Sequence, residues 1–97
     1  MNLATLYQEN LKTLVDAVDA AIAANSVDVM ASFDVWDDDE GNDPETSLCF
    51  GDTEIKLGDN YLALRMNQVR PMEATLAQWK AFFSKVTISA KGRINLP

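Results

Sequence analysis

Hydrophobic positions in the first quarter of the chain repeat at the spacing of an amphipathic helix. Residues 3–24 carry apolar side chains at three- and four-residue steps, with polar side chains between them. This pattern is typical of a helix that buries one face. Alanine is frequent toward its end and favours the helical state. We therefore expect a helix over residues 3–24 that stops at Asn25-Ser26.

The apolar period changes to two after this helix, which indicates a half-buried strand over residues 27–36. Residues 37–45 (DDDEGNDPE) have the composition of an exposed turn. The inward positions of the strand are Val27, Val29, Ala31, Phe33 and Val35, and the outward positions are Asp28, Met30, Ser32, Asp34 and Trp36.

Residues 47–57 read as a further strand, in which Gly51-Asp52 is either a tight turn or a bulge. Gly58-Asp59-Asn60 predicts a hairpin turn into another strand over residues 61–66. Pro71 is expected to open a second helix, with an apolar stripe that ends at Val86. Residues 87–90 could add a short strand before a turn at residues 91–93.

This order of elements predicts an α+β fold. We expect residues 1–97 to form a single compact domain of two layers. An antiparallel sheet of three to four strands would carry two flanking helices, in the order α-β-β-β-α with a possible C-terminal strand. Hydrophobic residues make up 47% of the chain, which is enough for a buried core.

Charge is distributed very unevenly along the chain. Residues 16–59 hold thirteen acids and one base, Lys56, a net charge of −12. Residues 60–97 hold six bases and one acid, Glu73, a net charge of +5, and the whole chain carries −7. The electrostatic field of a net negative chain repels nucleic acids and anionic membranes and attracts basic surfaces. The bases of the C-terminal third either balance acids within the fold or surround a partner site.

The residues that catalysis, metals and cofactors require are missing or poorly placed. The chain has no histidine to act as a base near neutrality. Cys49 is the only cysteine, and its apolar neighbours predict a small core residue in a negative field, which disfavours a nucleophile. An EF-hand loop with Gly41 as its internal glycine would have Trp36 at its first ligand position, and Trp36 cannot ligate. We expect no enzyme activity, no cofactor and no metal site, in a soluble cytoplasmic protein without a membrane span.

The acids themselves are the candidate site. Eight lie between Asp28 and Glu45 without one base, a density whose self-repulsion favours a use beyond solubility. Carboxylates two apart on a strand lie about 6.5 Å from each other, close to the spacing of phosphates along nucleic acid. Trp36 would anchor the margin of this patch or cover a second helix. The candidate partner-binding residues are Asp28, Asp34, Trp36, Asp37, Asp38, Asp39, Glu40, Asp43, Glu45, Asp52 and Glu54.

In its length, in the acids from Asp28 to Glu54 and in its lack of catalytic residues, the chain resembles small acidic phage-encoded DNA mimics. These include anti-CRISPR and anti-restriction proteins. The resemblance implies a non-enzymatic inhibitor, in the host bacterial cytoplasm, that occupies the basic nucleic-acid-binding site of a defence protein or ribonucleoprotein complex. The chain also resembles bacterial immunity proteins, which neutralise basic nucleases. The alternative is a structural or assembly subunit that oligomerises through an apolar surface, whereas the inhibitor is expected to be a monomer.

Overall fold

The computed structural model describes residues 2–36, 45–66 and 73–97. The long helix α1 (Leu3–Ala24) leads through a turn into β1 (Met30–Trp36), followed by β2 (Glu45–Phe50) and β3 (Thr53–Gly58). Helix α2 (Tyr61–Met66) comes next, and strand β4 (Ala74–Thr75) runs directly into helix α3 (Leu76–Ser84). Strands β5 (Thr87–Ile88) and β6 (Ile94–Asn95) form a small antiparallel pair near the C-terminal end.

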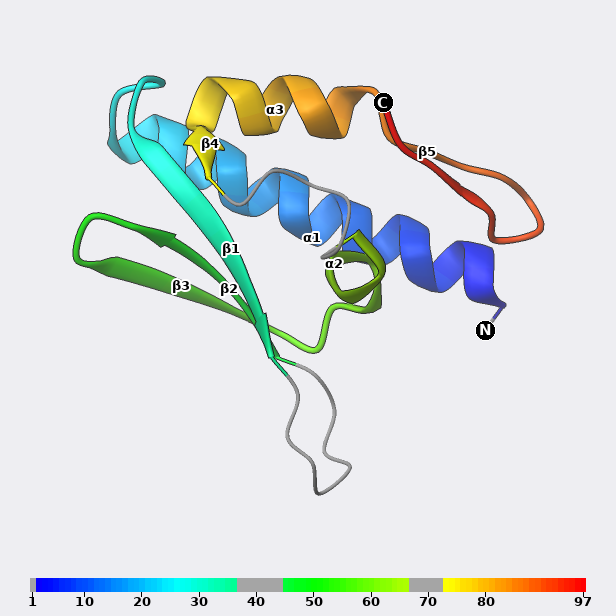
Figure 1. Cartoon of the computed structure of the whole chain (residues 1–97). Coiled ribbons are helices and arrows are strands. Elements are labelled where there is room, and N and C mark those ends of the chain that lie inside the picture. The colour runs from blue at the N-terminus through cyan, green and yellow to red at the C-terminus, as the bar shows by residue number, and fades with distance from the viewer. Residues whose placement is uncertain (1, 37–44, 67–72) are drawn as a thin grey trace.

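The main sheet is antiparallel, with the strand order β3-β2-β1-β4, and the helices cover one of its faces (Figure 1). Ala31 and Phe33 of β1 and Leu48 of β2 are buried against the helices. The alternate residues of the same strands point the other way, and Met30, Asp34 and Glu54 are exposed there. The expected α+β fold, with helices on an antiparallel sheet, is therefore confirmed.

Aromatic side chains join α3 to the covered face. The Trp79 indole is fully buried and donates a hydrogen bond to the Ala31 carbonyl at 2.9 Å. Phe33 contacts the Trp79 and Phe83 rings edge-on, with centroids 4.9 and 5.6 Å away. Such pairs add to the free energy gained from the buried area alone.

Strand β1 is shorter than the sequence predicts, because Val27 and Asp28 lie in a turn before Met30. The carbonyls of Val27 and Val29 accept hydrogen bonds from the first N–H groups of α3, Ala77 N at 3.0 Å and Leu76 N at 2.9 Å. These donors have no partner within their own helix. The backbone of this segment therefore accepts hydrogen bonds from the start of α3 and does not extend the sheet. Asp28 consequently lies in a turn and not on the face of the strand.

The predicted single strand over residues 47–57 is two strands. Phe50 pairs with Thr53, so Gly51-Asp52 is the tight turn of a hairpin rather than a bulge. Gly51 has a φ of 56°, which glycine adopts at little cost. The register of β2 with β3 shifts instead between Thr46 and Ser47.

The predicted strand over residues 61–66 is wrong, since these residues form α2 and Arg65 lies in its last turn. Asn60, 1% exposed, accepts a hydrogen bond from Ala63 N at 2.9 Å, as an N-cap residue does. Asn10 of α1 accepts from Tyr61 N and Leu62 N at 2.7 and 3.3 Å. These bonds occupy the first N–H groups of the segment, which favours a helix over a strand.

The second long helix begins at Leu76 rather than at Pro71, which lies outside the described residues. Thr75 and Gln78 form a capping box, with bonds of 2.9 and 3.1 Å between each side chain and the other residue's backbone N–H. This Thr-x-x-Gln pattern is a sequence signature of a helix start. The short strand predicted at residues 87–90 is present as β5 at Thr87–Ile88.

We expect Asn60→Ala to lower the free energy of unfolding by about 1–3 kcal/mol. The change removes the cap on α2 and leaves the Asn10 carbonyl, which accepts from Asn60 Nδ2 at 3.1 Å, without that donor. Urea unfolding followed by circular dichroism measures the effect. Asn95→Ala at an exposed position is the matched control and should stay within about 0.5 kcal/mol of the parent. Equal stability of the two variants would contradict a capping role for Asn60.

Candidate functional site: the open face of the sheet

The sheet face opposite the helices, which we call the open face, carries four of the described carboxylates. Asp34 lies on β1, Glu45 and Glu54 on β2 and β3, and Glu73 directly before β4, and all four are exposed. Lys56 of β3 is the one described cation on this face. The open face is therefore negative by three charges among the described residues.

One row of side chains crosses the open face. Cys49 pairs with Ser32 on one side and with Glu54 on the other. Glu73 extends this row beyond β1, because it precedes the pair Ala74–Ala31 and lines a hollow together with Ser32 and Cys49. The row thus has carboxylates at both ends and small side chains between them. Adjacent strands lie about 4.8 Å apart, so its ends are about 14 Å apart at the backbone.

The hollow over this row has a volume of about 290 Å³ and is lined by Met30, Ala31, Ser32, Cys49, Phe50, Gly51 and Glu73. Small side chains at Ser32 and Cys49 and the missing side chain at Gly51 leave this space open. Met30, 52% exposed, forms an apolar edge. An extended cationic side chain with an apolar stem is complementary to such a surface.

Neutral donors hold two of the carboxylates along parallel diagonals of the sheet. Cys49 Sγ donates to Asp34 Oδ2 at 3.4 Å, and Ser47 Oγ donates to Glu54 Oε1 at 2.9 Å. Among the described residues, neither carboxylate has a cationic nitrogen within 4.0 Å. Each of these carboxylates therefore accepts a hydrogen bond from a neutral donor of β2 and keeps its charge free of a described cationic partner.

Cys49 lies on the open face, partly exposed, rather than in the core where its neighbours predict it. Burial raises the pKa of this thiol to about 11, with further contributions from its hydrogen bond to Asp34 and from the charges of Asp34 and Glu54. A thiol with this pKa is protonated near neutrality and is a poor nucleophile. Cys49 is a hydrogen-bond donor for the carboxylate.

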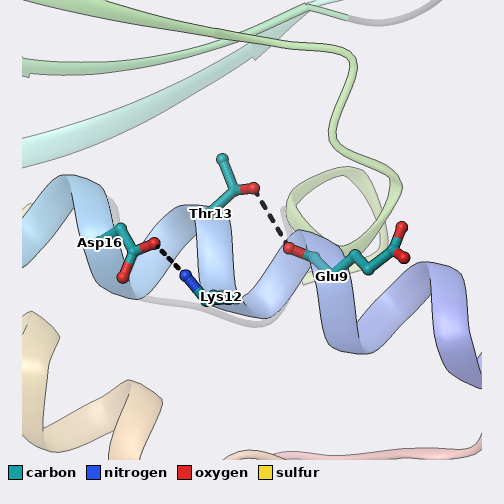
Figure 2. Close-up of polar contacts among 4 residues, drawn as sticks. All are labelled: Glu9, Lys12, Thr13 and Asp16. Carbon is teal, nitrogen blue, oxygen red and sulfur yellow. Dashed lines mark hydrogen bonds and ion pairs between the residues drawn. The ribbon is translucent and has the colours of Figure 1, made fainter.

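Acids outside the open face have other surroundings. On α1, Asp16 accepts from Lys12 Nζ at 2.8 Å, while the Glu9 carboxylate points away from that pair (Figure 2). Asp19 of α1 pairs with Lys80 of α3 at 3.0 Å. This pair shows one C-terminal base balancing an acid within the fold, although exposed pairs contribute little stability.

The candidate residues predicted from sequence are brought together only in part. Asp34, Glu45 and Glu54 share the open face, and Trp36 pairs with Glu45 through the backbone of the ladder. Asp28 and Asp52 lie in turns at the same end of the sheet. Asp37, Asp38, Asp39, Glu40 and Asp43 lie outside the described residues, so their role stays a prediction.

Among the described residues, β1 carries one acid on this face, Asp34, and the turn whose acids would continue a row lies largely outside the described residues. The described carboxylates are spread across the strands. Glu73 was missed, since β4 joins the sheet through two pairs with residues far away in sequence, Met30–Thr75 and Ala31–Ala74. The period-two pattern that reveals longer strands does not exist in a strand of two residues.

Two further observations concern the kind of protein. Within the described ranges, no three histidine, cysteine or carboxylate side chains gather as a metal ion would require. No described helix is long and apolar enough to span a membrane. Comparison with protein-family models, curated proteins and solved structures gives no match for this chain.

We expect Cys49 to react with iodoacetamide at pH 8 about 100-fold more slowly than an unperturbed thiol, since its pKa is about 11 rather than 9. Asp34→Asn should speed the reaction, because it removes the carboxylate that stabilises the protonated thiol. Labelling followed by mass spectrometry measures both rates. Glu45→Gln is the control, as an acid of the same face without an effect on this thiol. Equal rates for both variants would exclude the Asp34 contact.

The raised pKa of Cys49 also predicts that the folded protein loses stability in alkaline solution. The folded protein keeps the Cys49 proton to a higher pH than the unfolded chain, so it binds more protons between pH 9 and 11. The free energy of unfolding attributable to this group is therefore constant below pH 9 and falls as the pH rises toward 11. Urea unfolding of the parent and of Cys49→Ser across this range measures the difference.

Proposed function

We propose that this protein is a non-enzymatic inhibitor whose open sheet face occupies a basic, nucleic-acid-binding surface of a host defence protein or ribonucleoprotein complex. The observation that carries the proposal is the set of exposed carboxylates on the sheet, of which Asp34 and Glu54 accept hydrogen bonds from Cys and Ser donors rather than from cations. Neutral donors preserve the field that attracts a basic partner.

Electrostatic complementarity supports the proposal further. A partner that binds nucleic acid presents lysine and arginine at the spacing of phosphates. Fixed carboxylates that face such side chains need little reordering on binding, which lowers the entropic cost of association. The hollow beside Glu73 can take the apolar stem of one of these side chains while its charged head meets a carboxylate. Such a protein blocks a site without turnover.

The first test is capture of partners from a bacterial lysate at low and at high salt, with mass spectrometry of the bound proteins. We expect a nucleic-acid-binding protein that is lost at high salt and displaced by DNA. The captured partner should bind the triple variant Asp34→Asn, Glu54→Gln, Glu73→Gln at least tenfold more weakly than the parent, chiefly through a slower association rate. Surface plasmon resonance measures both rates.

The matched control removes three charges elsewhere, with Glu9→Gln, Asp16→Asn and Asp59→Asn. Both triples have the same net charge, so a loss confined to the open-face variant assigns binding to that face. A third triple, Asp37→Asn, Asp38→Asn and Asp39→Asn, tests the remaining acids. Equal affinity of all the triples, or recovery only of salt-resistant partners, would refute the proposal and favour an assembly subunit.

A further inference from the structure

A groove lies between the first two turns of α1 and helix α2. Its volume is about 450 Å³, and its lining residues are Leu3, Leu6, Tyr7, Tyr61, Leu64 and Arg65. Leu3 is 49% and Leu64 37% exposed, which places two of the four large exposed apolar side chains of the described chain at this groove. Exposed apolar side chains gathered around a concave surface are typical of a binding site.

Arg65 gives the groove a positive charge. Its Nε donates to Tyr7 Oη at 3.2 Å, which holds the guanidinium beside the apolar lining. A guanidinium has five N–H donors, so four remain for an acceptor in the groove. No carboxylate is among the described lining residues, and none of the described acids lies within 4.0 Å of Arg65.

The turn between β5 and β6 adds two bases at this end of the molecule (Figure 1). Gly92, with a φ of 84°, lies so close to α1 that a Cβ on it would be 3.1 Å from Leu3. Lys91 and Arg93 flank this glycine and are exposed. Three cations therefore lie at or beside the apolar groove, in contrast to the negative open face.

We propose that this groove binds a peptide segment of a partner protein in which an apolar side chain stands next to a carboxylate. The apolar side chain packs between Leu3 and Leu64, and the carboxylate accepts from the Arg65 guanidinium, which suits two parallel bonds. Peptides with an apolar face commonly dock in grooves between helices. The site goes beyond the proposed function, because it is a second surface with the opposite charge preference.

The net charge of −7 does not prevent an acidic peptide from binding there. The groove is at the N-terminal end of α1, whereas β1 of the open face begins after the turn that follows the C-terminal end of this helix. A helix of 22 residues is about 33 Å long. Salt screens charges over about 8 Å at physiological ionic strength. An approaching peptide therefore meets the local field of Arg65, Lys91 and Arg93.

The test is a titration of the ¹⁵N-labelled protein with acetyl-Leu-Glu-Leu-Glu-amide, and with acetyl-Leu-Lys-Leu-Lys-amide as the charge-reversed control. We expect chemical-shift changes at Leu3, Leu64 and Arg65 with the acidic peptide only. Arg65→Gln should weaken its binding at least tenfold, and Arg65→Lys should restore part of the affinity because it keeps the charge. Leu64→Ser should also weaken binding, and circular dichroism verifies that each variant is folded.

Lys56→Gln, a cation removed from the open face, is the matched control and should leave peptide binding unchanged. The open-face triple variant should bind the peptide like the parent, so failure of this proposal and failure of the inhibitor proposal are distinguishable. Equal binding of both peptides, or binding of neither, would overturn the assignment. Sedimentation of the protein alone tests a second copy as occupant: a dimer that Leu64→Ser dissociates would also overturn it.

Discussion

The hydrogen bond from the Trp79 indole to the Ala31 carbonyl is the contact on which the arrangement of the two layers depends. It joins the middle of α3 to the first residues of β1 at 2.9 Å, inside a cluster in which Phe33 and Phe83 contact the same indole. A buried carbonyl without a donor costs about 1–3 kcal/mol. The Phe33 side chain, which contacts the same indole, places the covered face of β1 against α3. The alternate face, with Asp34, is thereby left open.

An open sheet face that carries like charges is costly, and the structure limits this cost by spacing. The carboxylates of Asp34 and Glu54 lie on two different strands and that of Glu73 directly before a third, with Ser and Cys side chains between them. Each carboxylate is exposed, so water screens the repulsion that remains. Lysine or arginine side chains paired with these carboxylates would reduce the repulsion further, but they would also cancel the negative electrostatic field of the open face. The use of neutral donors at these positions is consistent with a surface that meets a basic partner.

The sequence predicts the elements whose apolar period is long, and it fails where a contact from elsewhere decides the conformation. Helix α1 and the inward residues Ala31 and Phe33 follow from period alone. The turn residues Gly58-Asp59-Asn60 predict a strand over residues 61–66. The hydrogen bonds from the first N–H groups of this segment to Asn10, which is distant in sequence, favour a helix instead. The Thr75-x-x-Gln78 pattern in the sequence marks the start of α3. No local sequence pattern predicts that Glu73 lies on the open face, since only the pairing of β4 with the distant β1 brings it there.

The charge distribution along the chain only partly predicts the charge of the surfaces. Acids of the same sequence tract separate in space, because Asp16 and Asp19 bind Lys12 and Lys80 on the helices while Asp34 and Glu54 stay free of cations on the described open face. Bases of the C-terminal third separate likewise, with Lys80 in an ion pair and Arg65 beside an apolar groove. A charge becomes available to a partner where the fold supplies a neutral donor or acceptor to hold it. Tyr7 does this for Arg65 as Ser47 does for Glu54, and these two contacts hold charges of opposite sign at two separate sites.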